Sequence, residues 1–425
     1  MTESALNMPR PVRRASVAIA AISTIVEWYD FTLYLYFATV LSRVFYGGGR
    51  AALATALGGF AIAYLLRPLG AMVFGHVGDR SGRRRTMLLS VAIMTAAMAA
   101  TAVLPTHAQA GAVAGWLLFL LRCVMGFSVG GEYGVVVAYL VESAAPHRRG
   151  LVASLASAAS EVGALLAVGV CSLTVSLLDP AALDAWGWRI PFLFGTAVAA
   201  CVWIARAAMA ESPDFLAQQA SGSVPANPLL LACTRHRAGI GRAFAISALG
   251  SITYYVGITY VPAFLTSNGA MDEAQALKLS TIAAVAVILV TPLTGWLADR
   301  YGRKPVLLWL AGLSAALSAA MFHFMAAGPH AGALSGAVVL ACVAGAVSAV
   351  GAPATAEQFP GAGRISGLAL GQTTATAIFG GLTPYISQLL VRQTGSALAP
   401  GLLIATVALA VLPVLLALPE TAPRN

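Results

Sequence analysis

The residues of this sequence that could do chemistry are ionisable side chains inside long apolar stretches. Six of them fall in the first half of the chain, namely Glu27, Asp30, Arg67, Arg122, Glu132 and Glu161. A carboxylate in apolar surroundings can take up and release a proton, and a guanidinium can bind a carboxylate through two parallel hydrogen bonds. Burying such charges is expensive, so they usually mark a substrate path or a proton relay. The apolar stretches of the second half offer only His323 and neutral polar groups, so we expect proton handling in the first half.

The apolar stretches are too abundant for a soluble protein. Hydrophobic residues make up 59% of the 425 residues and charged residues 10%, whereas an ordinary soluble domain has about 25% charged residues. Lipid must solvate this surface, and the composition therefore predicts an integral membrane protein. The five cysteines are isolated, and the sequence has no phosphate-binding loop, zinc-ligand spacing or Gly-x-Ser-x-Gly motif. We therefore expect no enzyme activity, no cofactor and no metal.

Twelve segments are long enough to cross the hydrocarbon core, which takes roughly 20 apolar residues. They lie near 16–45, 52–77, 86–104, 113–141, 150–178, 189–210, 240–267, 276–298, 305–327, 332–356, 363–391 and 399–418. We expect an all-α membrane protein whose twelve transmembrane helices form two parallel, pseudo-symmetric six-helix bundles. The expected organisation is a tail at 1–14, a first bundle at 15–210, an inter-bundle linker at 211–239, a second bundle at 240–418 and a tail at 419–425.

The basic residues are distributed unevenly between the two sides of the expected membrane. Twelve crossings put both termini on one side, and most of the 25 Lys and Arg residues fall in the tails and loops of that side, Arg206 and Arg364 among them. Such an excess marks the cytoplasmic face. We expect a multi-pass protein of a bacterial-type inner membrane with both termini cytoplasmic. The formal charge of +9 then reflects topology, and we expect no nucleic-acid partner.

Two motifs occur once in each half and in the same order. The string Gly-x-x-x-Asp-Arg-x-Gly-Arg contains Asp79 and Arg83 in its first copy and Asp299 and Arg303 in its second. A glutamate followed by a basic turn comes after the fourth segment, at Glu142, and after the tenth, at Glu357. Because order and sidedness are preserved, the halves are predicted to be parallel repeats. Folds of that kind open alternately to the two sides of the membrane by rocking one half against the other.

The string at 75–85 resembles the signature of the major facilitator superfamily, and the copy at 295–304 strengthens the resemblance. A finer resemblance is to the metabolite:proton symporter family, which includes carriers for citrate, α-ketoglutarate, shikimate and proline or betaine. It is carried in the expected order by segments 27–31, 67–71, 126–132, 187–192, 211–215 and 377–384. The chain departs from the family at 154–161 and 371–373, where the usual Trp-Gln and Tyr-Asn or Tyr-Ser pairs are missing. The mechanism therefore carries over better than the substrate.

The resemblance also implies roles for individual residues. In related sugar–proton carriers an acidic residue of the first span faces an arginine of the fourth, and Asp30 and Arg122 match those positions. We expect proton coupling by Asp30, Glu27 and Arg122. The resemblance further implies a gating latch that holds the outward-facing state, formed by Asp79, Arg83 and Glu142, with Asp299, Arg303 and Glu357 as its counterpart.

The substrate is expected to be a small molecule that travels with a proton. The expected binding residues are Arg67, Arg122, Glu132, Glu161, Tyr254, Tyr255, Gln372 and Thr376. The two arginines favour a citrate-like or other organic acid, whereas Glu161 could meet an ammonium group and favour a zwitterion such as proline or betaine. Glu132 could instead pair with Arg67. Proton-driven symport of an organic acid by alternating access is the expected function, with zwitterion symport, or proton-antiport export of a metabolite, siderophore or drug, as alternatives. The partners are then the solute, the proton and the lipid bilayer, and a monomer suffices.

Overall fold

The computed structural model describes residues 14–267, 271, 273–327 and 330–423, so the expected tail at 1–14 lies outside it except for Arg14. Every regular element in the described part of the chain is a helix. Ten of these helices are long and apolar enough to cross a membrane, or up to eleven if one bent pair counts as a single span. A further interrupted helical segment, 364–394, is consistent with twelve crossings. The predicted all-α membrane fold is confirmed.

The first half contains six crossings that match the predicted segments. They are α1 (Arg14–Ile22) with α2 (Thr24–Tyr36) and α3 (Ala38–Tyr46), α4 (Gly49–Leu65) with α5 (Arg67–Ser81), α6 (Arg83–Ala102), α8 (Ala112–Ser143), α9 (Arg149–Leu177) and α11 (Arg189–Ala207). Short elements connect some of them, namely α7 (His107–Ala110), η1 (Pro146–Arg148), α10 (Pro180–Ala182) and the π-helical turn η2 (Leu183–Gly187).

The second half differs because two of its crossings are broken by π-helical turns. The seventh consists of α14 (Arg237–Tyr254), η3 (Tyr255–Thr259) and α15 (Val261–Ser267), and its two α-helical parts meet at 41°. The eleventh consists of α19 (Arg364–Leu368), η4 (Ala369–Thr373), α20 (Thr374–Thr376), η5 (Ala377–Gly381) and α21 (Thr383–Thr394). The other crossings are α16 (Glu273–Tyr301), α17 (Arg303–Ala327), α18 (His330–Ala356) and α22 (Ala399–Leu416). Such turns often occur at functional sites.

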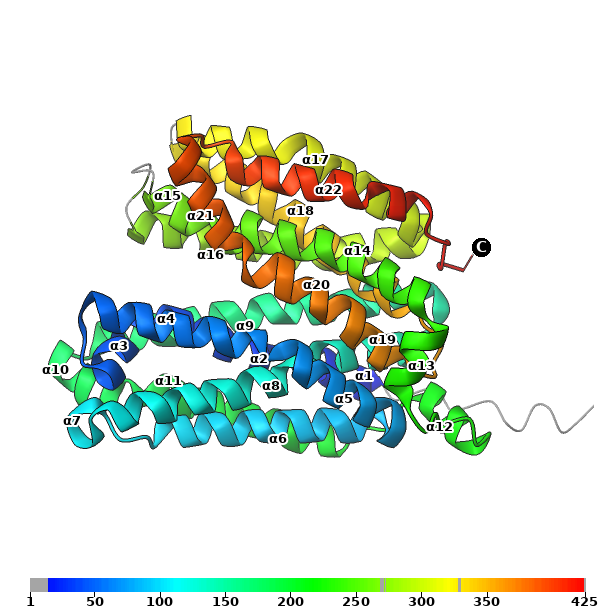
Figure 1. Cartoon of the computed structure of the whole chain (residues 1–425), viewed down its shortest axis with the longest axis horizontal. Helices are drawn as coiled ribbons and strands as arrows, with labels where there is room; N and C mark the ends of the chain where they lie inside the picture. The colour runs from blue at the N-terminus through cyan, green and yellow to red at the C-terminus, as the bar shows by residue number, and fades with distance from the viewer. Residues whose placement is uncertain (1–13, 268–270, 272, 328–329, 424–425) are drawn as a thin grey trace, which may run out of the picture.

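The two bundles lie side by side, and the segment between them is helical in part. Figure 1 shows the first bundle below the second, with the C-terminus, α12, α13 and α19 at the same end of the molecule. The linker contains α12 (Pro213–Ala220) and α13 (Pro228–Arg235). Each begins with proline after a capping residue, since the side chains of Ser212 and Asn227 accept backbone N–H bonds from Phe215 and Leu230. Between the bundles, α9 packs along α16 and α18, and α5 packs against α19.

Glycines let α8 approach α4 and α5 until their backbones touch. A Cβ atom added at Gly126 would collide with the carbonyl oxygen of Ala63, and one added at Gly130 would collide with that of Arg67. Small residues that allow this kind of approach are common between membrane helices. The close approach also fixes the position of Arg67, the first residue of α5, against α8.

We expect Gly130→Ala to lower the free energy of unfolding by about 1–3 kcal/mol, because the added methyl group would meet a backbone carbonyl that cannot move aside as a side chain can. The matched control is Gly169→Ala in α9, where an added Cβ has no neighbour within 4 Å. The melting temperature of the purified protein in detergent would measure both. Equal melting temperatures for the two variants would contradict the packing argument.

Candidate functional site

A cavity of about 150 Å³ lies between the two bundles and is lined by both. The first half contributes residues of α2, α4, α5, α8 and α9, and the second half contributes residues of α14, η3, α16, α18 and the broken eleventh crossing. Among the described residues, its charged lining consists of Glu27, Arg67 and Glu161. Six of the eight expected binding residues line this cavity, namely Arg67, Glu161, Tyr254, Tyr255, Gln372 and Thr376. Their role in binding stays a prediction.

Arg67 is the one cation of the described cavity lining, and its partners hold it loosely. Its Nη1 lies 3.5 Å from Glu27 Oε1, which is long for a charge-assisted hydrogen bond. The guanidinium lies over the ring of Tyr64, 4.3 Å from the ring centroid, and 5.4 Å from that of Phe31. Contacts of this kind steady the group without using its N–H donors. Arg67 is therefore oriented but still able to bind an anion.

Tyrosines connect the two halves across the cavity. The hydroxyl group of Tyr254 donates to Glu161 Oε1 at 2.5 Å, and the hydroxyl groups of Tyr64 and Tyr255 lie 2.5 Å apart. The ring of Trp28 packs edge-on against Tyr254, with 5.2 Å between their centroids. Trp28 and Tyr64 were not among the expected site residues. Trp28 is adjacent to Glu27, and Tyr64 lies about one helical turn before Arg67.

Four polar atoms of the cavity lining are buried without a hydrogen-bond partner among the described residues. They are the donors Trp28 Nε1 and Arg67 Nε and the acceptors Glu27 Oε2 and Gln372 Oε1. Unmade hydrogen bonds of buried groups are costly. A ligand that offers both acceptor and donor groups would relieve this cost, so the lining is chemically incomplete without one.

The pair of Asp30 and Arg122 lies beside the cavity rather than in it. Arg122 Nη1 donates to both carboxylate oxygens of Asp30, at 3.0 and 2.8 Å, and both side chains are buried. The pair lines a second, smaller cavity of about 20 Å³. The structure thus brings together the two residues expected to couple to protons. It does not place Arg122 in the lining of the large cavity, which corrects its expected contact with substrate.

Glu132 also lies outside the large cavity, and the alternative in which it pairs with Arg67 is not formed. Its carboxylate instead binds the guanidinium of Arg206, on α11, and the hydroxyl group of Ser90. Arg206 donates to the carbonyl oxygen of Met87 at 2.7 Å as well and is fully buried. Arg206 was expected to lie in a loop, and it is the second-last residue of its helix. Its long side chain nevertheless points into the bundle.

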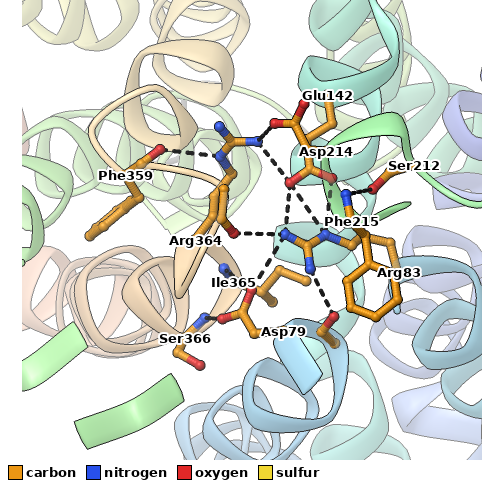
Figure 2. Close-up of polar contacts among 12 residues, drawn as sticks. Asp79, Arg83, Glu142, Ser212, Asp214, Phe215, Phe359, Arg364, Ile365 and Ser366 are labelled. Atoms are coloured by element: carbon orange, nitrogen blue, oxygen red, sulfur yellow. Dashed lines mark hydrogen bonds and ion pairs between the residues drawn. The ribbon is translucent and has the colours of Figure 1, made fainter. Parts of the chain in front are cut away.

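One end of the molecule, which we call the arginine-rich end, carries both copies of the repeated motif. Asp79 accepts the backbone N–H bonds of Ile365 and Ser366, at 3.2 and 2.8 Å, where α19 of the second half begins (Figure 2). Asp299 does the same for Gly150 and Leu151, both at 2.8 Å, where α9 of the first half begins. Each aspartate thus stabilises the exposed N–H groups of a helix start in the opposite half.

The ion pairs around the two aspartates are not equivalent. Glu142 binds Arg83 of its own half at 2.8 Å and Arg364 of the other half at 2.7 Å (Figure 2). Arg364 also reaches Asp214 of the linker helix α12, at 2.9 Å. In the described structure the side chain of Glu357 is bound from its own half, by Arg303 at 3.3 Å and by the hydroxyl group of Thr421 at 2.5 Å. The expected gating residues therefore meet as two clusters, and the one at Glu142 joins the halves more strongly.

Two further glutamates support the clusters from the ends of the bundles. Glu211 accepts the backbone N–H bonds of Arg83 and Arg84 at the start of α6, and Glu420 does so for Arg303 and Lys304 at the start of α17. Burial raises the pKa of the Glu211 carboxyl above its ordinary value, against the effect of these bonds. The sequence analysis did not identify either role.

Two repeated six-helix bundles around a polar cavity, with charge clusters closing one end, define a membrane transporter. The chain belongs to the major facilitator superfamily. The family model described as "Sugar (and other) transporter" matches residues 16–227, and the model described as "Major Facilitator Superfamily" matches residues 244–425. In fold, the chain is similar to a structure of the proton:xylose symporter XylE, with a TM-score of 0.79, 20% identity and 96% of each chain covered.

Curated relatives extend over most of the chain. It is 33% identical to the shikimate transporter of Escherichia coli, over 92% of this chain and 90% of that protein. It is 32% identical to the α-ketoglutarate permease of Escherichia coli, over 88% of this chain and 87% of that protein. It is 31% identical to the ectoine/proline transporter ProP of Corynebacterium glutamicum, over 93% of this chain and 82% of that protein. The predicted family resemblance is confirmed.

We expect Glu142→Gln to loosen the arginine-rich end, because it weakens the one carboxylate that binds arginines of both halves. The reporter is Ser366→Cys, at a fully buried position of this contact, in a background with the five native cysteines replaced by alanine. Alkylation by a maleimide should be accelerated by about 10-fold or more. The matched control, Glu357→Gln, should accelerate it less. A larger effect of the control would contradict the asymmetry of the two clusters.

Proposed function

We propose that the chain is a proton-coupled symporter of a small solute that carries a carboxylate group, working by alternating access. The main support comes from the state of Arg67. This residue lines a cavity between the halves, its Nε donor has no partner among the described residues, and its carboxylate neighbour Glu27 lies 3.5 Å away. A guanidinium in this state suits a two-pronged contact with a carboxylate. The relatives named for shikimate, α-ketoglutarate and ectoine or proline, all of which have a carboxyl group, support the proposal.

The arginine-rich end is proposed to face the cytoplasm, since short loops rich in Lys and Arg stay on that side. The two clusters at Glu142 and Glu357 then close the cytoplasmic side. Their cross-half bonds would have to break before the substrate could leave inward. The expected roles of Asp79, Arg83, Glu142, Asp299, Arg303 and Glu357 as a gate are carried into this proposal.

Asp30 is proposed to carry a proton. While ionised, its carboxylate holds Arg122 in a buried pair, and breaking that pair by removing one charge is costly because the other charge is left buried and unpaired. Protonation of Asp30 releases Arg122. This changes the relative free energies of the closed-pair and open-pair arrangements of the first bundle. Since a ligand shifts an equilibrium only through its different affinity for two states, the proton acts by favouring the arrangement in which the pair is open.

The charges of the large cavity favour a zwitterionic substrate over a polyanion. Glu161 and Glu27 contribute two carboxylates against one guanidinium, so a citrate-like ion would meet net repulsion. Glu161 has no cation partner and lies next to Tyr254, whose ring packs against Trp28. A carboxylate beside aromatic rings is suited to an ammonium or iminium group. We therefore propose a zwitterion first and, second, a monocarboxylate with hydroxyl groups, which would hydrogen-bond to a protonated Glu161.

We expect Asp30→Asn to abolish proton-driven accumulation while leaving exchange of labelled for unlabelled substrate, because the neutral side chain mimics a permanently protonated carboxyl group. The test uses proteoliposomes with an imposed inward proton gradient and labelled ectoine, proline, shikimate and α-ketoglutarate. Asp184→Asn is the control, since it removes a carboxylate paired with Arg43 in a half-exposed contact, which contributes about 0–1 kcal/mol. Undiminished accumulation by Asp30→Asn would refute the role of Asp30. Gradient-driven efflux without uptake would favour the exporter.

We expect Glu161→Gln to weaken the binding of ectoine and proline by about 10- to 100-fold, because a hydrogen-bonded charge contact is replaced by a neutral one. Binding of shikimate should change little. Thr376→Val is the matched control in the same cavity, where the side chain hydrogen-bonds to Ser251 at 3.1 Å. Competition against a labelled substrate in proteoliposomes would measure these affinities. Equal losses for ectoine and shikimate would rule out a dedicated site for the cationic group.

A further inference from the structure

Glu27 and Arg67 line both the large cavity between the bundles and the small cavity inside the first bundle. The large cavity and the small cavity beside Asp30 share the lining residues Glu27, Tyr64, Arg67 and Val129. We propose that Arg67 is exchanged between Glu27 and the carboxylate of the substrate, and that Glu27 takes up a second proton when it loses Arg67. The transporter would then move two protons with each substrate. This inference rests on the proposed symport function and adds its stoichiometry and the order of events.

The contact between Arg67 and Glu27 is poorly satisfied, unlike the two pairs Arg122–Asp30 and Arg206–Glu132 inside the same bundle. Its closest N–O distance is 3.5 Å, against 2.8 Å for Arg122 and Asp30. Glu27 Oε2 and Arg67 Nε are both buried and without a partner among the described residues. A contact this loose is the one that a substrate carboxylate could replace, because two well-formed hydrogen bonds would substitute for one long contact.

Among the described residues, no other free cation lies beside Glu27 to replace Arg67. On its own helix, Asp30 is bound by Arg122 of α8. The charged groups that face Glu27 from α8 and α11 are Glu132 and Arg206, which are bound to each other. The remaining neighbours with ionisable groups are the phenols of Tyr64, Tyr133 and Tyr255. A buried carboxylate left without a counter-charge is strongly disfavoured, and taking up a proton removes the charge.

A separate water-sized space lies beside Glu27 on the side of Asp30. The small cavity of about 20 Å³ joins the surroundings of Asp30 to Glu27 and has room for one water molecule. The proton comes from water on the open side and ends on a carboxylate oxygen of Glu27, while the substrate carboxylate stays ionised and bound by Arg67. Without substrate, Arg67 stays with Glu27 and favours its ionised form. A proton therefore binds Glu27 more readily with substrate present than without it.

The coupling has to be reciprocal. If substrate binding favours the protonated form of Glu27, then protonation of Glu27 increases the affinity for substrate by the same factor. A proton released from Glu27 on the cytoplasmic side would allow Arg67 to return to it. The substrate carboxylate would then be displaced toward the cytoplasm.

The test is the number of protons moved with each substrate, measured in proteoliposomes from the membrane potential at which net flux of labelled proline or shikimate is zero. We expect two protons per substrate for the unchanged chain and one for Glu27→Gln, which is neutral and leaves Arg67 free. Glu27→Asp retains a carboxylate and should restore two. A value of one for the unchanged chain, or two for Glu27→Gln, would overturn the inference while leaving proton symport intact.

A second measurement covers the case in which Glu27→Gln does not transport. Purified protein in weakly buffered detergent, followed with a pH-indicator dye, reports protons taken up when saturating proline or shikimate is added. The unchanged chain should take up about one proton more than Glu27→Gln at the same pH. Equal uptake would overturn the inference. Failure of the unchanged chain to accumulate any of the four solutes would instead refute the proposed function, and with it this stoichiometry.

Discussion

A charge inside a membrane protein must be paired or neutralised, and the rest of this structure depends on how each buried charge meets that requirement. Arg122 and Arg206 each hold one carboxylate of the first bundle tightly, at Asp30 and Glu132. Arg67 holds Glu27 loosely, and Glu161, which forms no ion pair within the described part of the chain, is bound by a tyrosine hydroxyl group of the other half. The groups that are least satisfied are those that line the large cavity. The cavity is thus the place where a solute and a proton can complete what the chain leaves unpaired.

The same requirement explains the closed end of the molecule. Asp79 and Asp299 are buried among backbone N–H groups of helices that belong to the opposite half. A helix start presents several unpaired N–H groups that stabilise a carboxylate. Each aspartate also has an arginine of its own half nearby, Arg83 at 3.6 Å from Asp79 and Arg303 at 2.8 Å from Asp299. The bonds to the helix starts are made across the two bundles, so they exist only while the bundles are together at this end. A rocking motion would expose these groups to water, which can replace the lost bonds, and this keeps the cost of opening moderate.

The sequence predicted the fold well because its signals are local. Span length, the bias of basic residues and the repeated motif each depend on short stretches, and they predicted twelve crossings in two related halves. The partner of Glu132 was not predicted, since Arg206 lies 74 residues away on another helix and its position near a helix end looked like a loop. The contact of Arg364 with Glu142 spans 222 residues and both halves. Pairings of that kind depend on how the bundles pack, which no local pattern records. The π-helical turns η3, η4 and η5 were missed for the same reason.

The division of labour between the halves follows from where these elements lie. The first half supplies every charged residue of the described cavity lining, whereas the second half supplies hydroxyl and amide groups, several of them on crossings broken by π-helical turns. Substituting a neutral side chain on irregular backbone leaves no charge unpaired. The free-energy cost of such a substitution is therefore small. The charged pairs of the first half have no such freedom. We therefore expect changes in the second half to alter the neutral groups that meet a solute while the charged pairs of the first half stay in place.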